Sequence, residues 1–279
     1  MVNLKGNISC KMLVLMDFSA ASYSALRYAI SLAKLGLGSI QVIHLADPAQ
    51  FIKSDNQAVA LKEISSETEK IENQLAAISE IILADGLPFK YQYSFGNRLQ
   101  ELQAHLAKNC PDLVIIGKKK DKPKSPGKVS SYLLDKYAGT LLIVDGPNEF
   151  LASTSISLGC NTRTFLQCDP QIVIHLKSLS QAPLTFVNVR NAIEPEAEID
   201  LSRPQMSFQD KNFKVERLVS PSVSQGLLAY IKEKKVSLIC LGRGRQKTIF
   251  YKLFFRQKAI LHTVYREVSI PILIMGADH

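Results

Sequence analysis

The most chemically suggestive segment of the sequence is a cluster of six lysines between residues 118 and 128. Closely spaced ammonium groups can hold a phosphate or another anion. The alternative is a solvated loop whose like charges repel one another. No aromatic side chains are interleaved with these lysines, so a stacking platform for single-stranded nucleic acid is not indicated. The segment therefore predicts an anion-binding loop or an exposed charged loop, and no nucleic-acid partner.

The histidines do not form a recognisable catalytic or metal-binding set with other residues. His105, His175 and His262 lie far apart in helical patterns, and none has a carboxylate or cysteine at the spacing of a metal ligand. No serine or cysteine is spaced with a histidine as a nucleophile with its base. We therefore expect no metal site, no catalytic residues and no enzymatic activity.

The length and composition indicate a two-domain globular protein. The chain has 279 residues, of which 46% are hydrophobic and 21% charged, and this length favours two domains of about 140 residues each. No run of about 18 apolar residues predicts a membrane span, and the first ten residues lack the apolar core of a signal peptide. We expect a soluble, cytoplasmic protein without a membrane partner.

Charge and cysteine content agree with that expectation. The net charge is +9, an excess that permits anionic partners without identifying one. The five cysteines are an odd number and contain no Cys-x-x-Cys pair. Since most of them lie in or beside apolar runs, they predict buried, reduced thiols rather than disulfides or a zinc site.

In the first half of the chain, short apolar runs alternate with amphipathic segments. Ser19 or Ser22 is placed to cap the first helix. The expected strands are 11–16, 39–45, 89–95, 113–116 and 141–144; the expected helices are 19–34, 57–84, one from about 99 to before Pro111, and 129–137. The apolar stripe expected on helix 57–84 consists of Leu61, Ile64, Ile71, Leu75, Ile78 and Ile82. Alternation of this kind predicts a parallel sheet with helices on both faces.

The second half repeats this order after a linker at 146–149. The expected strands are 155–160, 184–189, 213–219, 236–241 and 270–275, with a turn at 161–164 and helices at 170–180 and 222–235. A shift of 144 residues superimposes the first two strands of the halves, and a shift of 125 places Gly117 on Gly242. Where the long helix should recur, residues 191–210 look like a loop. We therefore predict duplicated domains at 1–147 and 148–279, the second shortened and degenerate.

These residues resemble the universal stress protein superfamily. The resemblance rests on the segment from Asp17 to Ser19, on His44 in its strand, and on residues 111–117, whose sequence is Pro-Asp-Leu-Val-Ile-Ile-Gly. It implies, in each domain, a five-stranded parallel α/β sandwich of the adenine-nucleotide α-hydrolase-like type. Members commonly dimerise through the last strand, so two tandem domains resemble an internal pseudo-dimer. Self-association would then use the closing strands 141–144 and 272–275.

The resemblance also implies a place for ATP or AMP. Many members bind the nucleotide with a Gly-x2-Gly-x9-Gly-Ser/Thr loop after the fourth strand, where backbone N–H groups at a helix N-terminus face the phosphates. The aspartate after the first strand and the residue at the end of the second strand frame the adenine and ribose. The matching positions in this sequence are Asp17, Leu45, Gly117, Gly127 and Lys128. Asp17 equally fits a residue that caps the following helix.

The loop departs from the family pattern in both halves. In the first, Lys120 stands at the second glycine, the loop is three residues shorter, and Lys128 replaces the hydroxyl residue. In the second, Arg245 stands at the second glycine and Asn161 replaces the aspartate. Arg243 and Arg245 nevertheless repeat the cationic character of the first loop. Two hypotheses follow: a non-enzymatic stress-response or regulatory module with weak or absent ATP binding, and an ATP or AMP binder whose lysines replace the missing glycine contacts.

Overall fold

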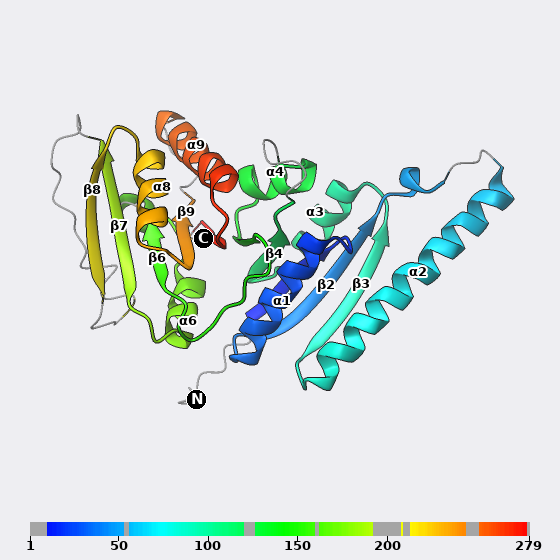
Figure 1. Cartoon of the computed structure of the whole chain (residues 1–279). Coiled ribbons are helices and arrows are strands. Elements are labelled where there is room, and N and C mark those ends of the chain that lie inside the picture. The colour runs from blue at the N-terminus through cyan, green and yellow to red at the C-terminus, as the bar shows by residue number, and fades with distance from the viewer. Residues whose placement is uncertain are drawn as a thin grey trace.

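The described strands form a ten-stranded sheet that spans both halves of the chain (Figure 1). The computed structural model describes residues 10–52, 56–119, 126–159, 162–191, 208, 213–243 and 251–277. The strand order is β3-β2-β1-β4-β5-β10-β9-β6-β7-β8. Read outward from its centre, this order places five strands of the first half on one side and five strands of the second half on the other.

The first half forms five parallel strands connected by helices. Its elements are β1 (Cys10–Met16), α1 (Ala20–Lys34), β2 (Gly38–Ala46), the 3-10 helix η1 (Pro48–Gln50), α2 (Gln57–Ala84), β3 (Phe89–Phe95), α3 (Arg98–Asn109), β4 (Leu113–Gly117), α4 (Lys128–Asp135) and β5 (Thr140–Val144). The predicted strands and helices of this half are confirmed, with ends displaced by one or two residues.

The second half repeats the same strand order. Its elements are β6 (Ile156–Gly159), α5 (Thr162–Phe165), α6 (Gln171–Leu179), β7 (Leu184–Asn191), β8 (Lys214–Ser220), α8 (Val223–Glu233), β9 (Leu238–Gly242), α9 (Tyr251–Glu267) and β10 (Ile272–Met275). The turn expected at 161–164 is instead the one-turn helix α5 from Thr162 onward. The loop expected at 191–210 lies almost wholly outside the described residues.

The two halves are joined by the antiparallel pairing of their closing strands. Leu273 of β10 lies opposite Leu142 of β5, and Ile272 lies opposite Ile143. Strand β5 is also hydrogen-bonded to β4, and β10 to β9. The closing strands thus pair the two halves within one chain, and both sides of each are already occupied. The expected fold, two tandem α/β units packed as an internal pseudo-dimer, is confirmed.

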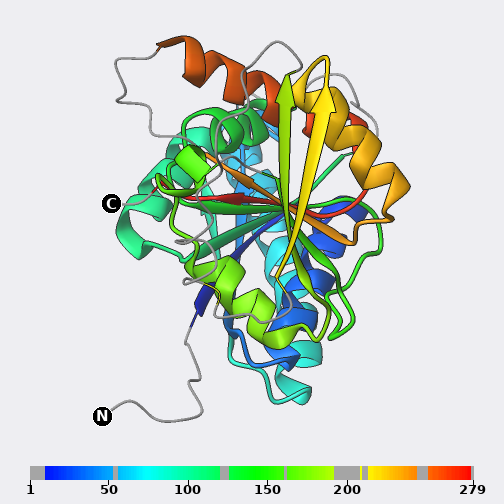
Figure 2. The ribbon, with the colours of Figure 1, turned by 90° about the vertical axis from the view of Figure 1, so that its left-hand side faces the viewer.

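Helices cover both faces of the sheet and bury two separate apolar clusters. Residues of α1, α2 and α6 bury one face, whereas residues of α3, α4, α8 and α9 bury the other. Alternate residues of the two closing strands enter different clusters, as Leu142 and Ile143 of β5 do. Seen from the second half, the strands fan strongly around the sheet axis (Figure 2), in keeping with the accumulated twist of many strands.

The long helix α2 covers the sheet with only its second half. Ile71, Leu75, Ile78 and Ile82 are buried, whereas Leu61, which we expected on the same apolar stripe, is 67% exposed. A 28-residue helix is about 42 Å long, and the seven-residue strand β3 beside it spans only about 23 Å. The first turns of α2 therefore extend beyond the sheet (Figure 1).

The cysteines follow the prediction except at one position. Cys10, Cys168 and Cys240 are buried free thiols, but Cys110, the C-cap of α3, is exposed and free. Cys160 lies outside the described residues. Within the part of the chain that the structure describes, no helix is long and apolar enough to cross a membrane.

Candidate functional site

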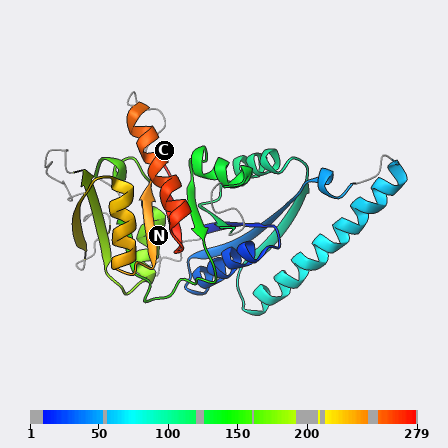
Figure 3. The same ribbon diagram turned by 45° about the horizontal axis from the view of Figure 1, so that its top comes forward.

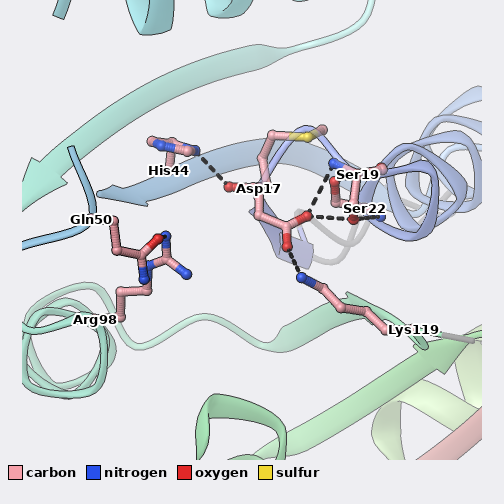
Figure 4. A network of polar contacts seen from close by, with 8 residues as sticks. Asp17, Ser19, Ser22, His44, Gln50, Arg98 and Lys119 are labelled. Atoms are coloured by element: carbon pink, nitrogen blue, oxygen red, sulfur yellow. Dashed lines mark hydrogen bonds and ion pairs between the residues drawn. The ribbon is translucent and has the colours of Figure 1, made fainter. Parts of the chain in front are cut away.

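Asp17 lies at the carboxyl end of β1 and fixes the start of α1 (Figure 4). Its Oδ1 accepts hydrogen bonds from the Ser19 backbone N–H at 3.2 Å and from Ser19 Oγ at 2.5 Å. Ser19 Oγ in turn accepts from the Ser22 N–H at 3.3 Å and caps the helix. The cap predicted at Ser19 is confirmed. The alternative prediction, that Asp17 caps the helix itself, is wrong. Asp17 instead orients Ser19, and Ser19 caps the helix.

The second oxygen of Asp17 is paired with a lysine from the cationic loop. Lys119 Nζ lies 2.5 Å from Asp17 Oδ2, with both side chains partly exposed. Strands β1 and β4 are neighbours in the sheet, and the strand order reverses between them. Parallel α/β sheets bind ligands at the carboxyl ends of the strands beside such a reversal. The ion pair therefore occupies the position where this fold class most often places a ligand.

Protonation of Asp17 should weaken the folded state only in strong acid. Burial of its carboxyl favours the neutral form, but the hydrogen bonds from Lys119 and Ser19 outweigh this and lower the pKa of Asp17 to about 2. A carboxyl whose pKa is lowered in the folded state stabilises the protein at pH values above its ordinary pKa near 3.8. This contribution is lost as the pH falls towards 2. Wild type should therefore lose its stability advantage over Asp17→Asn between about pH 4 and pH 2.

Urea unfolding of wild type and Asp17→Asn across this pH range measures the effect. The variant keeps an oxygen that accepts from Ser19 but loses the charge facing Lys119. When Lys119→Met is already present, Asp17→Asn should change the unfolding free energy less in the same range, because the partner charge is gone. A difference in unfolding free energy that stays constant from pH 5 to pH 2 would contradict the assignment.

His44 and Phe18 form an aromatic pair beside Asp17. His44 Nδ1 is hydrogen-bonded to the Met16 carbonyl at 2.9 Å, and its ring stacks on Phe18 with centroids 4.6 Å apart. Burial lowers the pKa of His44, so the ring is neutral at physiological pH. Phe18 has a φ of 56°, which is unusual and strained for a residue other than glycine. These contacts hold His44 as a structural residue.

Polar side chains from η1 and α3 extend the site on the side of β2 and β3. Arg98, the first residue of α3, donates through Nη2 to Gln50 Oε1 at 2.7 Å. Figure 4 shows this pair, His44 and the pair of Asp17 with Lys119 gathered around the carboxyl ends of the strands. Neither Gln50 nor Arg98 was predicted to belong to the site, because no periodic or motif signal in the sequence points to them.

Gly117 ends β4 and is required by packing. A Cβ atom at Gly117 would lie 2.0 Å from the carbonyl oxygen of Ala21 in the first turn of α1. The glycine therefore allows the start of α1 to approach the end of β4. Its predicted association with nucleotide binding is not needed to explain why glycine stands there.

Lys118 contradicts the expectation of an exposed or anion-binding loop. It is only 8% exposed, and its Nζ donates to the Val268 carbonyl at 2.7 Å. Arg243, at the matching place in the second half, is 5% exposed and donates to carbonyls of α4. Both cations enter the junction between the halves because helix ends there expose unpaired carbonyl groups. Residues 120–125 and 244–250, which carry most of the remaining loop charge, lie outside the described residues.

The other predicted site residues are not joined to Asp17 by any contact within the described part of the chain. Leu45 is 8% exposed near the end of β2. Gly127 is the N-cap of α4 without a side-chain capping hydrogen bond, and nothing lies within 4 Å of the place a Cβ would occupy. Lys128, the first residue of α4, is exposed. Among the described residues, no group of three His, Cys, Asp or Glu side chains is arranged to hold a metal ion.

Comparison with known proteins agrees with this architecture. The model of the universal stress protein family matches residues 10–145. No curated protein sequence matches the chain. Among solved structures, a universal stress protein from Archaeoglobus fulgidus DSM 4304 superimposes with a TM-score of 0.72 at 16% identity, over 96% of this chain and 99% of that one.

A second structure shows the same likeness. A functionally unknown protein from Pseudomonas aeruginosa PAO1 has a TM-score of 0.61 at 12% identity, over 98% of this chain and 94% of that one. At these identities the superpositions show the fold, and they extend it over both halves. Residues 10–145 therefore form a universal stress protein domain, and residues 156–275 repeat its fold in the same chain.

Proposed function

We propose that the protein is a non-enzymatic module of the universal stress protein type whose first half binds adenine nucleotides weakly or not at all. Its cellular task would be regulatory association in a stress response, in the cytoplasm. The four cysteines in the described part of the chain are free thiols, which supports a reducing compartment. The observation that carries the proposal is the ion pair between Asp17 and Lys119 at 2.5 Å.

This ion pair opposes ligand binding at the end of β1. Asp17 is the residue implied to frame the ribose or adenine. One of its carboxylate oxygens already pairs with Lys119, and the other already accepts a hydrogen bond from Ser19. A nucleotide that used the Asp17 carboxylate would have to replace both contacts. The partly exposed ion pair with Lys119 contributes at most about 1 kcal/mol, and the hydrogen bond from Ser19 about 1.5–3 kcal/mol. The free energy needed to break these contacts would weaken the binding of the nucleotide by the same amount.

The start of the loop is also committed to packing. Gly117 contacts the backbone of α1, and Lys118 is buried at the junction of the two halves. Neither residue is therefore available to approach a phosphate without rearrangement. These contacts support a structural assignment for the first loop positions.

A second candidate function, ATP or AMP binding with lysines replacing the glycine contacts, is favoured by the start of α4. Gly127 and Lys128 begin a helix whose first N–H groups have no side-chain cap. Uncapped helix N-termini attract anions, and an exposed lysine at the first position would add a charge. This arrangement supports phosphate binding at α4 independently of Asp17.

Calorimetric titration of ATP into the full chain, with and without magnesium, tests both functions. The first predicts no saturable heat below about 1 mM ATP, a free energy of binding weaker than about 4 kcal/mol. Saturable micromolar binding at one site per chain would overturn it and support the second function. In that case Lys128→Ala should weaken binding by about 1–3 kcal/mol, while the matched exposed-lysine variant Lys62→Ala on α2 should bind like wild type.

A further inference from the structure

We propose that Lys118 and Arg243 form a reciprocal latch that makes the end of each half depend on the other half. Each cation leaves the end of the fourth strand of its own half and binds the C-terminal carbonyl groups of the last helix in the opposite half. The latch does not depend on nucleotide binding. Its predicted consequence is a crossed coupling, in which a change in one half loosens a helix in the other.

The two residues occupy equivalent places in the duplicated fold. Lys118 directly follows Gly117 at the end of β4, and Arg243 directly follows Gly242 at the end of β9. The shift of 125 residues that relates the glycines also relates the two cations. Positive charge has therefore been placed twice at the same position, and in both cases the side chain is buried rather than directed to solvent.

Lys118 holds the end of α9 in the second half. Its Nζ donates to the Val268 carbonyl at 2.7 Å and lies 3.5 Å from the Arg266 carbonyl. Asp145, which is also buried, pairs with the same Nζ at 3.4 Å. The ammonium group lies 5.5 Å from the centre of the Tyr265 ring, where a cation–π contact adds to the attraction. Three partners in the second half and one in the first thus compensate the buried charge.

Arg243 holds the end of α4 in the first half. Its Nη1 donates to the Leu134 carbonyl and its Nη2 to the Leu133 carbonyl, both at 2.8 Å. The planar guanidinium group thereby satisfies two consecutive carbonyls in the last turn of α4. Burial lowers the pKa of Arg243 to about 10, so the side chain remains charged at neutral pH.

Both contacts meet a general need of helix ends. The last carbonyls of a helix have no partner within the helix, and they carry the negative end of its dipole. A cation placed there both donates the missing hydrogen bonds and neutralises the dipole. Removing it from a buried junction would leave carbonyls unpaired and away from water, which is costly.

The helices that the latch binds also contact each other. Figure 3 shows α9 beside α4 at the junction of the two halves. Asp135, the last residue of α4, accepts from His262 Nε2 at 2.7 Å and pairs with Lys258 at 3.0 Å. These contacts hold the end of α4 against the middle of α9, so a change at either cation acts on two helices that are already joined.

Hydrogen exchange on the full chain, followed by mass spectrometry of its peptides, tests the crossed coupling. In Lys118→Met, amides in the last turns of α9 should exchange about 10- to 100-fold faster, the opening expected from a lost charge-assisted hydrogen bond. In Arg243→Met, the same increase should appear in the last turn of α4. Each substitution thus produces its main effect in the half that does not carry it.

Two further variants provide the control and the safeguard. Lys119→Met removes the neighbouring lysine, whose described ion pair stays within the first half, and it should leave exchange in α9 unchanged. Arg243→Lys keeps the charge but lacks the planar fork that donates to two consecutive carbonyls in a fixed geometry, and it should give a smaller increase in α4 even if Arg243→Met does not fold. Faster exchange confined to the substituted half, or no change in the opposite helix, would overturn the latch.

Discussion

Replacing Gly117 with alanine is expected to lower the free energy of unfolding by about 3 kcal/mol or more. The added Cβ would lie 2.0 Å from the Ala21 carbonyl oxygen and 2.2 Å from its carbonyl carbon. These are backbone atoms of the first turn of α1, so no flexible side chain can move aside. Relief requires α1 to shift away from β4, which would disturb the buried face that α1 covers.

Gly127→Ala is the matched control for this prediction. Both glycines belong to the same loop pattern, yet Gly127 has a φ of −63° and no atom within 4 Å of the position that an added methyl group would take. Alanine there should change the free energy of unfolding by less than about 1 kcal/mol, because reduced chain entropy offsets a poorer N-cap. Urea unfolding monitored by circular dichroism compares the two. Equal costs would show that the close approach of α1 to β4 does not constrain Gly117.

The strands and most helices could be predicted because their signals are local. The apolar runs of β4 and β5 are short and bounded by turns, and the helical repeat of residues 57–84 matches α2 residue for residue. The repeated order of elements also predicted that the second half copies the first. Each of these inferences needed only neighbouring residues and the rule that alternating elements form a parallel sheet.

Partners that are distant in the sequence could not be predicted in the same way. Lys118 meets Val268, a residue 150 positions away, and Arg243 meets Leu133, 110 positions away. A run of lysines is usually solvated, so its first member appeared to belong to the loop. The repetition of a cation after both Gly117 and Gly242 was visible, but it equally suited an anion site. Only the junction of the two halves distinguishes these alternatives.

The proximity of Asp17 and Gly117 could be predicted, because Asp17 follows β1, Gly117 ends β4, and the carboxyl ends of these neighbouring strands meet at one edge of the sheet. Its closure by Lys119 was not predicted, since the direction of a long charged side chain depends on the fold around it. The prediction that Leu61 belongs to the buried stripe was wrong for a different reason. The apolar pattern of α2 begins before Ile71, but strand β3 is too short to cover the first turns of the helix.

Replacing Leu273 with alanine is expected to lower the free energy of unfolding by about 2–5 kcal/mol, the usual cost of a large cavity in a core. Leu273 of β10 is fully buried, and Leu142 of β5 lies directly opposite it in the antiparallel pair. This pair joins the two halves at the centre of the sheet. The substitution should therefore destabilise both halves together, rather than only the half that contains β10.

Unfolding of Leu273→Ala, Leu142→Ala and the double variant measures this shared contribution. Residues in contact are not energetically independent, so the double variant should differ from the sum of the single effects by at least about 0.5 kcal/mol. Leu151→Ala is the control, because Leu151 is 55% exposed and its loss should cost less than about 0.5 kcal/mol. Additive effects of Leu142 and Leu273 would mean that each stabilises only its own half. A coupled loss would instead show that the closing strands form one core, in which neither half reaches its full stability without the other.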